Sequence, residues 1–193
     1  MVAIRKSLWI GALVFGVAFL ALGIFFVAKG FEAKGIITTA LAEENVTTSA
    51  DAVKFGVPAG LPVRDARTAQ AQADTIKLHS TAIKGEVLKS GTPTTLYYAD
   101  MKSALFVSPE AYAAARSTYV TGLTLRGALG LAVMGYGLAD LAIGAGAVIG
   151  LMGLMTVALG VPALYWAKEA EGEVVREVSH RLTPAPLIGG GSR

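Results

Sequence analysis

Asp140 is the residue whose type and setting most directly suggest chemistry. It is the one charge in the apolar stretch 127–167. An ionisable side chain inside such a stretch is a functional-site hypothesis, since proton relays and ion pathways use carboxylates of this kind. Two other roles are open: hydrogen bonding to backbone amides at a turn or to a neighbouring helix, and a polar contact with a partner helix. A single carboxylate makes no pathway, so we expect the structural role.

Arg126 is the second intramembrane polar candidate. It precedes Asp140 by 14 residues, about 21 Å along one helix, so these two side chains cannot pair within that helix. A long arginine can extend to the lipid headgroups, or pair with an anionic lipid or another subunit. We expect it to extend to the headgroups.

His79 and His180 are the two histidines of the chain. A site with two histidines and one carboxylate would need both brought together with an acid. They lie in distant segments, and neither belongs to an HxH or HExxH spacing. We therefore expect ordinary exposed histidines, no metal, no cofactor and no enzyme, with a metalloenzyme at His79 and His180 as a remote alternative.

Composition indicates a membrane protein. Of 193 residues, 53% are hydrophobic and 16% are charged, against about 45–50% and about 25% in ordinary globular domains. The absence of cysteine excludes disulfides and thiolate metal sites. A net charge of +3 without a dense basic patch excludes nucleic acid as a partner.

Residues 7–28 carry no charge and are long enough, at about 33 Å, to cross a hydrocarbon core of about 30 Å. Arg5, Lys6 and Trp9 mark the near interface. A signal peptide is the rival interpretation, but its apolar region is normally about 7–15 residues. We therefore expect an uncleaved anchor.

The second apolar stretch, 127–167, is too long for one span of about 20 residues. The glycines at 144 and 146 suggest a turn, giving a second span over 121–143 and a third over 147–167. Tyr165, Trp166 and Lys168 would anchor the end of the third span at the interface.

The predicted fold class is therefore all-α: an integral membrane protein with three transmembrane helices and a small, mostly helical exposed segment. The predicted parts are an anchor helix (1–29), an exposed cap (30–120), a transmembrane helical hairpin (121–167) and a polar, flexible tail (168–193). Within the cap, Asp65 predicts the start of a helix over 66–84. Pro109 predicts the start of a helix that continues into the second span.

Orientation follows from the basic residues at the start of the first span, which favour the cytoplasm for the N-terminus. With three spans, residues 30–120 and the tail would both lie outside a bacterial plasma membrane. Lys168, Arg176 and Arg181 in the tail argue weakly for the opposite arrangement.

Glycines are frequent in the predicted hairpin. Small residues let helix backbones approach closely in lipid. These positions could pack the second span against the third, or assemble the chain with another protein. The predicted helix-packing residues are Gly127, Gly130, Gly135, Gly137, Gly146, Gly150 and Gly153.

Two segments resemble a known family. Ala71–Ser80 (AQADTIKLHS) is similar to the Ala-Gln-Ala-Asp-x-Ile-x-x-His element of small three-span membrane proteins from actinobacteria and related bacteria. Leu125–Leu154 resembles their Leu-Arg start, Gly-x-Ala-Asp centre and glycine-rich turn. The resemblance covers most of residues 1–167 and implies a bacterial plasma-membrane protein with no assigned activity.

Members of this family are often labelled ring-opening dioxygenases. Ring cleavage at iron requires a ligand set that one histidine per segment can barely supply. The relatives commonly continue with a Gly-Gly-Lys-Thr-Tyr-like element, whereas this chain has Lys84-Gly85-Glu86 in the matching region. Any role of that element is therefore not carried over.

The leading functional prediction is an accessory or structural subunit that packs through its glycine-rich hairpin against a larger bacterial membrane complex. Its predicted partners are the lipid bilayer and other membrane subunits or further copies of the chain. The alternative is a lipid-binding or small-molecule-binding membrane module that uses the exposed cap, with Arg126 at a headgroup.

Overall fold

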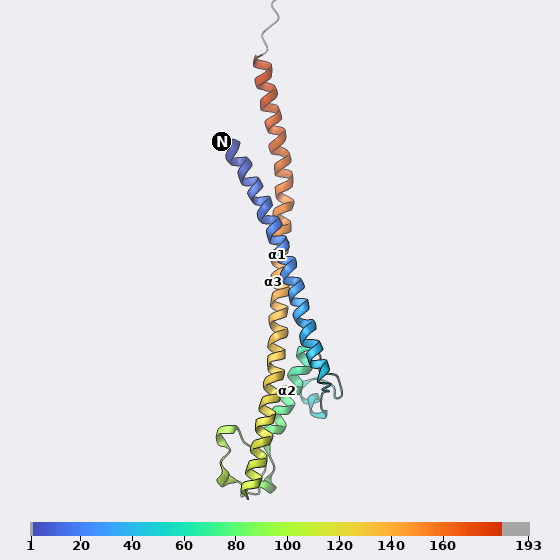
Figure 1. The fold of residues 1–193 in the computed structure, drawn as a ribbon, viewed down its shortest axis with the longest axis vertical. Helices are drawn as coiled ribbons and strands as arrows, with labels where there is room; N and C mark the ends of the chain where they lie inside the picture. The colour runs from blue at the N-terminus through green and yellow to red at the C-terminus, as the bar shows by residue number, and fades with distance from the viewer. Residues whose placement is uncertain (1, 183–193) are drawn as a thin grey trace, which may run out of the picture. The chain divides into compact units, whose positions relative to one another are not determined.

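The structure is a computed structural model that describes residues 2–182. Side-chain surroundings are described from Trp9 to Pro162 and at part of the positions beyond. The chain is mostly helical (Figure 1), with α1 (Val2–Glu43), α2 (Ala66–Thr81) and α3 (Pro109–Leu182) as its α-helices. Two two-residue strands, β1 (Ala82–Ile83) and β2 (Thr94–Thr95), pair antiparallel. Short 3-10 helices cover Ala50–Phe55, Gly85–Val87, Tyr98–Asp100 and Ser103–Leu105.

Within the residues that the structure describes, two helices rather than three are long and apolar enough to cross a membrane: α1 over Trp9–Glu43 and α3 over Pro109–Pro162. The predicted turn between the second and third spans was wrong, since residues 144–146 lie inside α3. A glycine in a helix interior costs about 1 kcal/mol relative to alanine, which weakens a helix without ending it. The turn was inferred from bilayer thickness, which sets no upper limit on helix length.

The predicted starts of two helices agree with the structure, whereas α2 ends at Thr81 rather than at the predicted residue 84. α2 begins after Asp65, whose carboxylate accepts the N–H of Thr68 at 2.7 Å. The Thr68 hydroxyl in turn accepts the Asp65 N–H, so the two residues form a capping box. α3 begins at Pro109, as predicted.

The chain divides into two compact units. The first comprises 1–27 and 144–193, and the second comprises 28–143. The first unit contains the beginning of α1 and the later part of α3, and the second contains everything between.

In the first unit, buried glycines bring α1 and α3 together. A Cβ on Gly23 would lie 2.5 Å from the backbone nitrogen of Gly150. A Cβ on Gly16 would lie 2.9 Å from Val157 Cγ2. From Gly16 to Gly23 the contact moves seven residues forward in α1, and its partner moves seven residues back in α3, from Val157 to Gly150. The two segments therefore run antiparallel and touch through their backbones.

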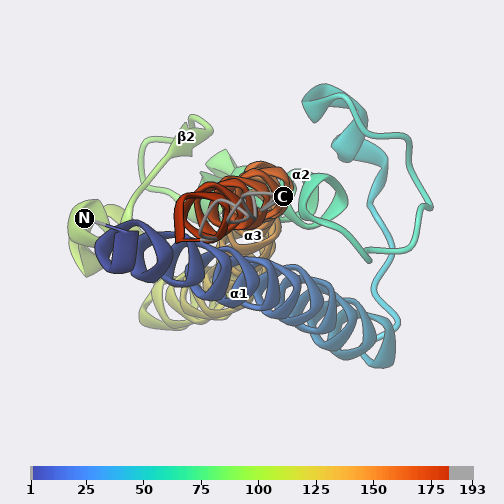
Figure 2. The ribbon, with the colours of Figure 1, turned by 90° about the horizontal axis from the view of Figure 1, so that it is seen from above.

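In the second unit, alanines on different faces of α2 allow close packing on two sides. Ala69 and Ala73 pack in a buried cluster with Leu129 of α3. Ala71 packs with Ala52 and Val57 in the segment before α2. Figure 2 shows that this preceding segment and the segment carrying β2 extend to opposite sides of α2.

The segment between α2 and α3 has a small core of its own. Phe106 is 1% exposed and packs edge-on against Tyr112 of α3, with ring centroids 5.5 Å apart. Ile83, Leu88 and Met101 complete this cluster around Tyr119 of α3. These contacts hold the β1–β2 segment on the beginning of α3.

Candidate functional site

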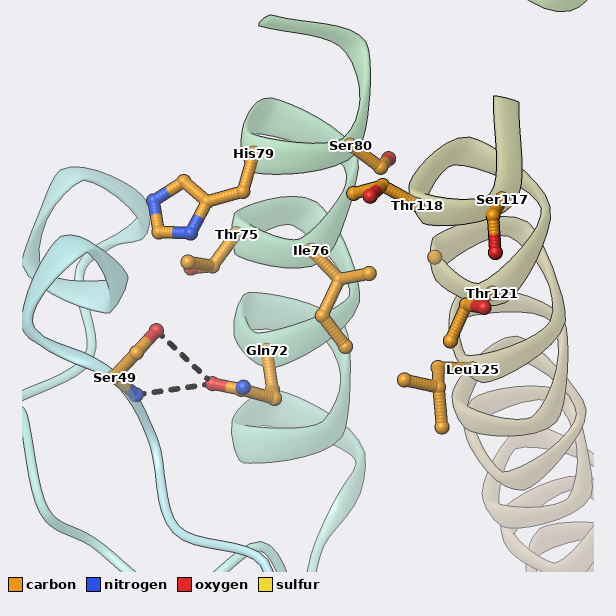
Figure 3. A pocket seen from close by; sticks show the side chains of 11 residues that line it. Ser49, Gln72, Thr75, Ile76, His79, Ser80, Ser117, Thr118, Thr121 and Leu125 are labelled. Atoms are coloured by element: carbon orange, nitrogen blue, oxygen red, sulfur yellow. Dashed lines mark hydrogen bonds between the residues drawn. The ribbon is translucent and has the colours of Figure 1, made fainter. Parts of the chain in front are cut away.

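A pocket of about 420 Å³ lies between α2, α3 and Ser49 in the segment before α2. Figure 3 shows side chains from all three contributing segments around it. The lining is mainly neutral and polar, with an imidazole on one side. Its residues are Ser49, Gln72, Thr75, Ile76, His79, Ser80, Ser117, Thr118, Thr121, Gly122 and Leu125.

Gly122 sets the spacing of the two helices at the pocket. A Cβ at this position would lie 2.5 Å from Ser80 Cβ, so only glycine permits the observed approach. Ile76 and Leu125 supply apolar surface, and Figure 3 shows Ile76 directed from α2 toward α3.

Several hydroxyls of the lining donate their hydrogens within the protein. Thr75 Oγ1 donates to Ala71 O at 2.9 Å, and Thr118 Oγ1 donates to Ala114 O at 3.1 Å. A hydroxyl that donates in this way still has lone pairs available as acceptors. The pocket walls therefore favour ligands that carry N–H or O–H donors.

The opposite wall is fixed by Gln72 and Ser49. Gln72 Oε1 accepts the backbone N–H of Ser49 at 3.0 Å (Figure 3). This bond holds the segment before α2 against the helix and keeps one side of the pocket in place.

His79 lies at the edge of the pocket and contacts Asp51. The Nε2 atom of His79 is 2.6 Å from Asp51 Oδ2, and Lys54 Nζ is 2.8 Å from Asp51 Oδ1. The hydrogen bonds from Lys54 and then His79 lower the pKa of the Asp51 carboxyl below its ordinary value. His79 is therefore one of three residues in a partly exposed polar cluster with Asp51 and Lys54.

The residues that the structure describes contain no group of three or more histidine, cysteine, aspartate or glutamate side chains placed to hold a metal ion. His180 lies in α3, but its side chain falls outside the described residues. The hypothesis that joins His79 to His180 therefore gains no geometric support.

Asp140 pairs with Lys34 of α1. Its side chain is 63% exposed and that of Lys34 is 33% exposed. The predicted contact of Asp140 with a neighbouring helix is thus present, but its partner is a lysine on α1. The sequence did not identify Lys34 as the partner of Asp140. The two residues are more than 100 positions apart, and neither segment alone shows how α1 and α3 align.

A buried tyrosine lies one helical turn from this pair. Tyr136 is 5% exposed, and its hydroxyl donates to Arg64 O at 2.6 Å. Thr38 Oγ1 of α1 lies 2.7 Å from the same phenol oxygen. The tyrosine therefore ties α1, α3 and the residues just before α2 at one point. Nothing in the local sequence around Tyr136 distinguishes it from an interfacial tyrosine.

Arg126 is half-buried in α3, three residues before Leu129 of the core. Among the residues that the structure describes, its guanidinium has no hydrogen-bond or ion-pair partner. It does not reach Asp140, as the sequence predicted.

The predicted packing glycines fall into two groups. Gly146, Gly150 and Gly153 face α1, and Gly135 meets Ile37 of α1. Their contacts thus lie with the first helix, and not with a third span as one of the two alternatives for these glycines would require. The remaining positions have no neighbouring atom within 4 Å of a Cβ built on them: Gly127, Gly130 and Gly137.

Of the predicted interface anchors, Tyr165 and Trp166 are 71% and 72% exposed, and Lys168 is also exposed. Trp9 is half-buried. Arg5 and Lys6 lie in α1, but their side chains fall outside the described residues.

Comparisons with known proteins find no match to this chain. No protein-family model matches the chain. Neither the curated proteins nor the solved structures contain a match. Function must therefore be inferred from the residues themselves.

Proposed function

We propose that this protein is a two-span membrane protein whose second unit is a binding module for a small, neutral, polar molecule. The observation that carries the proposal is the pocket between α2 and α3, with its array of hydroxyl acceptors. The two apolar helices would fix this unit at a bacterial plasma membrane.

The register of α1 and α3 supports two spans. The contact of Gly16 with Val157, and that of Gly23 with Gly150, align the uncharged stretch 7–28 with 145–166, which is also uncharged. Each stretch is about 33 Å long as a helix, which matches a hydrocarbon core of about 30 Å.

Exposure of these helices further favours a bilayer. Only 11% of the most apolar window of each helix is buried. A core helix of a soluble protein would be covered on most sides. Here the uncovered side chains, such as Phe15 and Leu151, are apolar and suited to lipid.

With two spans, the basic residues at the beginning of α1 and those at the end of α3 favour the same membrane orientation. The beginning of α1 and the end of α3 then lie on the same side of the membrane. Arg5 and Lys6 at one end, with Lys168 and Arg176 at the other, all favour the cytoplasm. The second unit, 28–143, would face outside, and the C-terminal tail would lie inside rather than outside.

The pocket chemistry favours a sugar or polyol. Its lining includes several neutral acceptors, and Ile76 and Leu125 provide apolar contact for a carbon skeleton. Leu125 lies about 20 residues before the second span, or about 30 Å along a helix, so an acyl lipid in the bilayer would not reach this pocket.

A matched pair of threonine variants tests this proposal. Thr121 lines the pocket, whereas Thr124 is exposed on the same helix outside the lining. We expect a saturable rise in the unfolding midpoint of the detergent-purified wild type with at least one member of a monosaccharide and polyol panel. Thr121→Leu should abolish the rise by filling the pocket, and Thr124→Leu should retain it. No binding by any member of the panel, or equal binding by both variants, would contradict the proposal.

An accessory subunit is the second candidate, favoured by an apolar stripe on α3 beyond the proposed span. Leu131, Met134 and Leu138 are 70%, 65% and 65% exposed. They recur at the three-and-four spacing of a helix–helix seam. Leu131 would lie about 20 Å outside the hydrocarbon core, where lipid chains cannot cover it.

Gentle purification followed by native mass determination separates the two candidates. A stoichiometric set of larger membrane proteins that is lost in Met134→Glu would establish the accessory subunit. A lone chain or a homo-oligomer would favour the binding module.

A further inference from the structure

A second pocket, of about 370 Å³, lies where α1, α3 and the beginning of α2 meet. It is chemically unlike the hydroxyl-lined pocket because charged side chains dominate it. Three basic and two acidic residues contribute: Lys34, Arg64, Arg67, Asp65 and Asp140.

The two acidic residues already have partners inside the protein. Asp140 pairs with Lys34, and Asp65 accepts the N–H of Thr68 in the α2 cap. Arg67 donates to the backbone oxygen of Gly56. Among the residues that the structure describes, the guanidinium of Arg64 has no such partner, and its side chain is exposed at the pocket.

The backbone beneath Arg64 is held firmly. Its carbonyl oxygen accepts from the Tyr136 hydroxyl at 2.6 Å, and Thr38 Oγ1 lies within 3.3 Å of the same oxygen. Because these bonds involve the backbone only, the guanidinium can bind a ligand without disturbing them. The α1–α3 register places Lys34 in the same pocket.

Two residues of this pocket lie close along their helices to the ends of the proposed spans. Lys34 follows the end of the first span, at Ala28, by six residues, which is about 9 Å along a helix. Asp140 precedes the second span by five residues, which is about 7 Å. The headgroup layer extends about 5–8 Å beyond the hydrocarbon core, so separations this short leave Lys34 and Asp140 within reach of the lipid phosphates.

We propose that the pocket of Lys34 and Arg64 binds the phosphate of an anionic phospholipid in the outer leaflet. A guanidinium binds phosphate through paired N–H donors, and the Lys34 ammonium adds a second cation that Asp140 holds in position. The inference rests on the proposed membrane position of the second unit, and it does not depend on the ligand of the hydroxyl-lined pocket.

The experiment measures lipid binding to the full-length, detergent-purified chain by native mass spectrometry. The probes are dihexanoylphosphatidylglycerol, dihexanoylphosphatidylcholine and inorganic phosphate. The variants are Arg64→Gln and, as a control of the same residue type, Arg126→Gln. In the two-span proposal Arg126 lies 19 residues before the second span, about 28 Å along a helix, and so no longer at the headgroups. A double variant, Lys34→Gln with Asp140→Asn, removes the ion pair without leaving an unpaired charge.

We expect the wild type and Arg126→Gln to bind the phosphatidylglycerol alike, and Arg64→Gln to bind it about 5–10-fold more weakly. The double variant should also bind more weakly, and the phosphatidylcholine should bind poorly to all forms. Unchanged binding in Arg64→Gln would overturn the proposal, as would a loss confined to Arg126→Gln. Inorganic phosphate binding as tightly as the lipid would assign the site to a soluble anion and overturn the lipid source.

Extraction of native membranes with alkaline carbonate distinguishes a failure of the membrane assignment from a failure of this site. Release of the protein into the supernatant would contradict the two-span proposal itself. Retention in the membrane, combined with lipid binding insensitive to Arg64, would refute the headgroup site alone.

Discussion

At the residue scale, the groups that define the pockets act through partners distant in sequence. Tyr136 is polar only at its hydroxyl, and that atom binds Arg64 O and contacts Thr38. His79 is an ordinary exposed histidine in sequence terms, yet it meets Asp51 across 28 residues. Residue type indicated which side chains could act, and the fold determined what each one contacts.

The Asp51 cluster predicts a dependence of stability on pH. Lys54 and His79 lower the pKa of the Asp51 carboxyl in the folded protein. Its ionised form therefore stabilises the fold above the ordinary carboxyl pKa of 3.8, and this stabilisation is lost as the pH falls through the lower folded value. We expect the unfolding midpoint of the wild type to fall more steeply below about pH 4 than that of Asp51→Asn.

Thermal unfolding in detergent, followed by circular dichroism at each pH, measures this difference. Asp100→Asn is the control, since Asp100 is exposed and has no ion-pair partner among the described residues. Parallel curves for the wild type and Asp51→Asn would show that the cluster does not contribute.

At the element scale, glycine spacing governs how α1 and α3 pack. The buried glycines of α1 recur every seven residues at 16, 23 and 30, and three of the buried glycines of α3 recur in the same way at 146, 153 and 160. Small residues at this spacing allow backbones to approach along a continuous seam. The number of glycines suggested packing against a partner protein. Contacts between α1 and α3 within this chain account for part of that number.

Gly23→Leu should weaken this seam. Even a Cβ at Gly23 would lie 2.6 Å from Gly146 O and 2.5 Å from Gly150 N, both backbone atoms that cannot move alone. Overpacking of this kind costs about 1–3 kcal/mol, which corresponds to a fall of about 3–10 °C in the unfolding midpoint.

Gly11→Leu provides the matched control, because no atom lies within 4 Å of a Cβ at that position in the same helix. Both variants are measured by thermal unfolding in the same detergent. Equal midpoints would show that the Gly23 contact does not hold the helices together.

At the scale of the whole molecule, the number of spans determines which parts share a side of the membrane. With two spans, the second unit would lie on one side of the membrane and the end of α3 on the other. With three spans, the second unit and the end of α3 would lie on the same side. The continuity of α3 through residues 144–146 favours the two-span arrangement.

Cysteine accessibility in whole cells distinguishes these arrangements cleanly, because the chain contains no cysteine of its own. We expect an impermeant maleimide to label Gly60→Cys in intact cells and to label Lys168→Cys only after lysis. Labelling of both variants in intact cells would indicate three spans with the second unit and the tail outside. Labelling of Lys168→Cys alone would reverse the orientation.

The sequence by itself determined features that depend on local chemistry. The uncharged stretches, the aromatic and basic residues at their ends, the Asp65 cap and the Pro109 helix start are readable because each depends on neighbours a few residues away. The mostly helical character of the chain followed from the same reasoning.

Tertiary structure alone decided whether α3 continues through Gly146 and which residues form the two pockets. Gly146 and Gly153 lie against α1 in this continuous part of α3, and this contact is encoded in neither segment alone. The same register joins Lys34 to Asp140 and Thr38 to Tyr136. Contacts between distant segments depend on how whole helices align, and a single sequence does not specify that alignment locally.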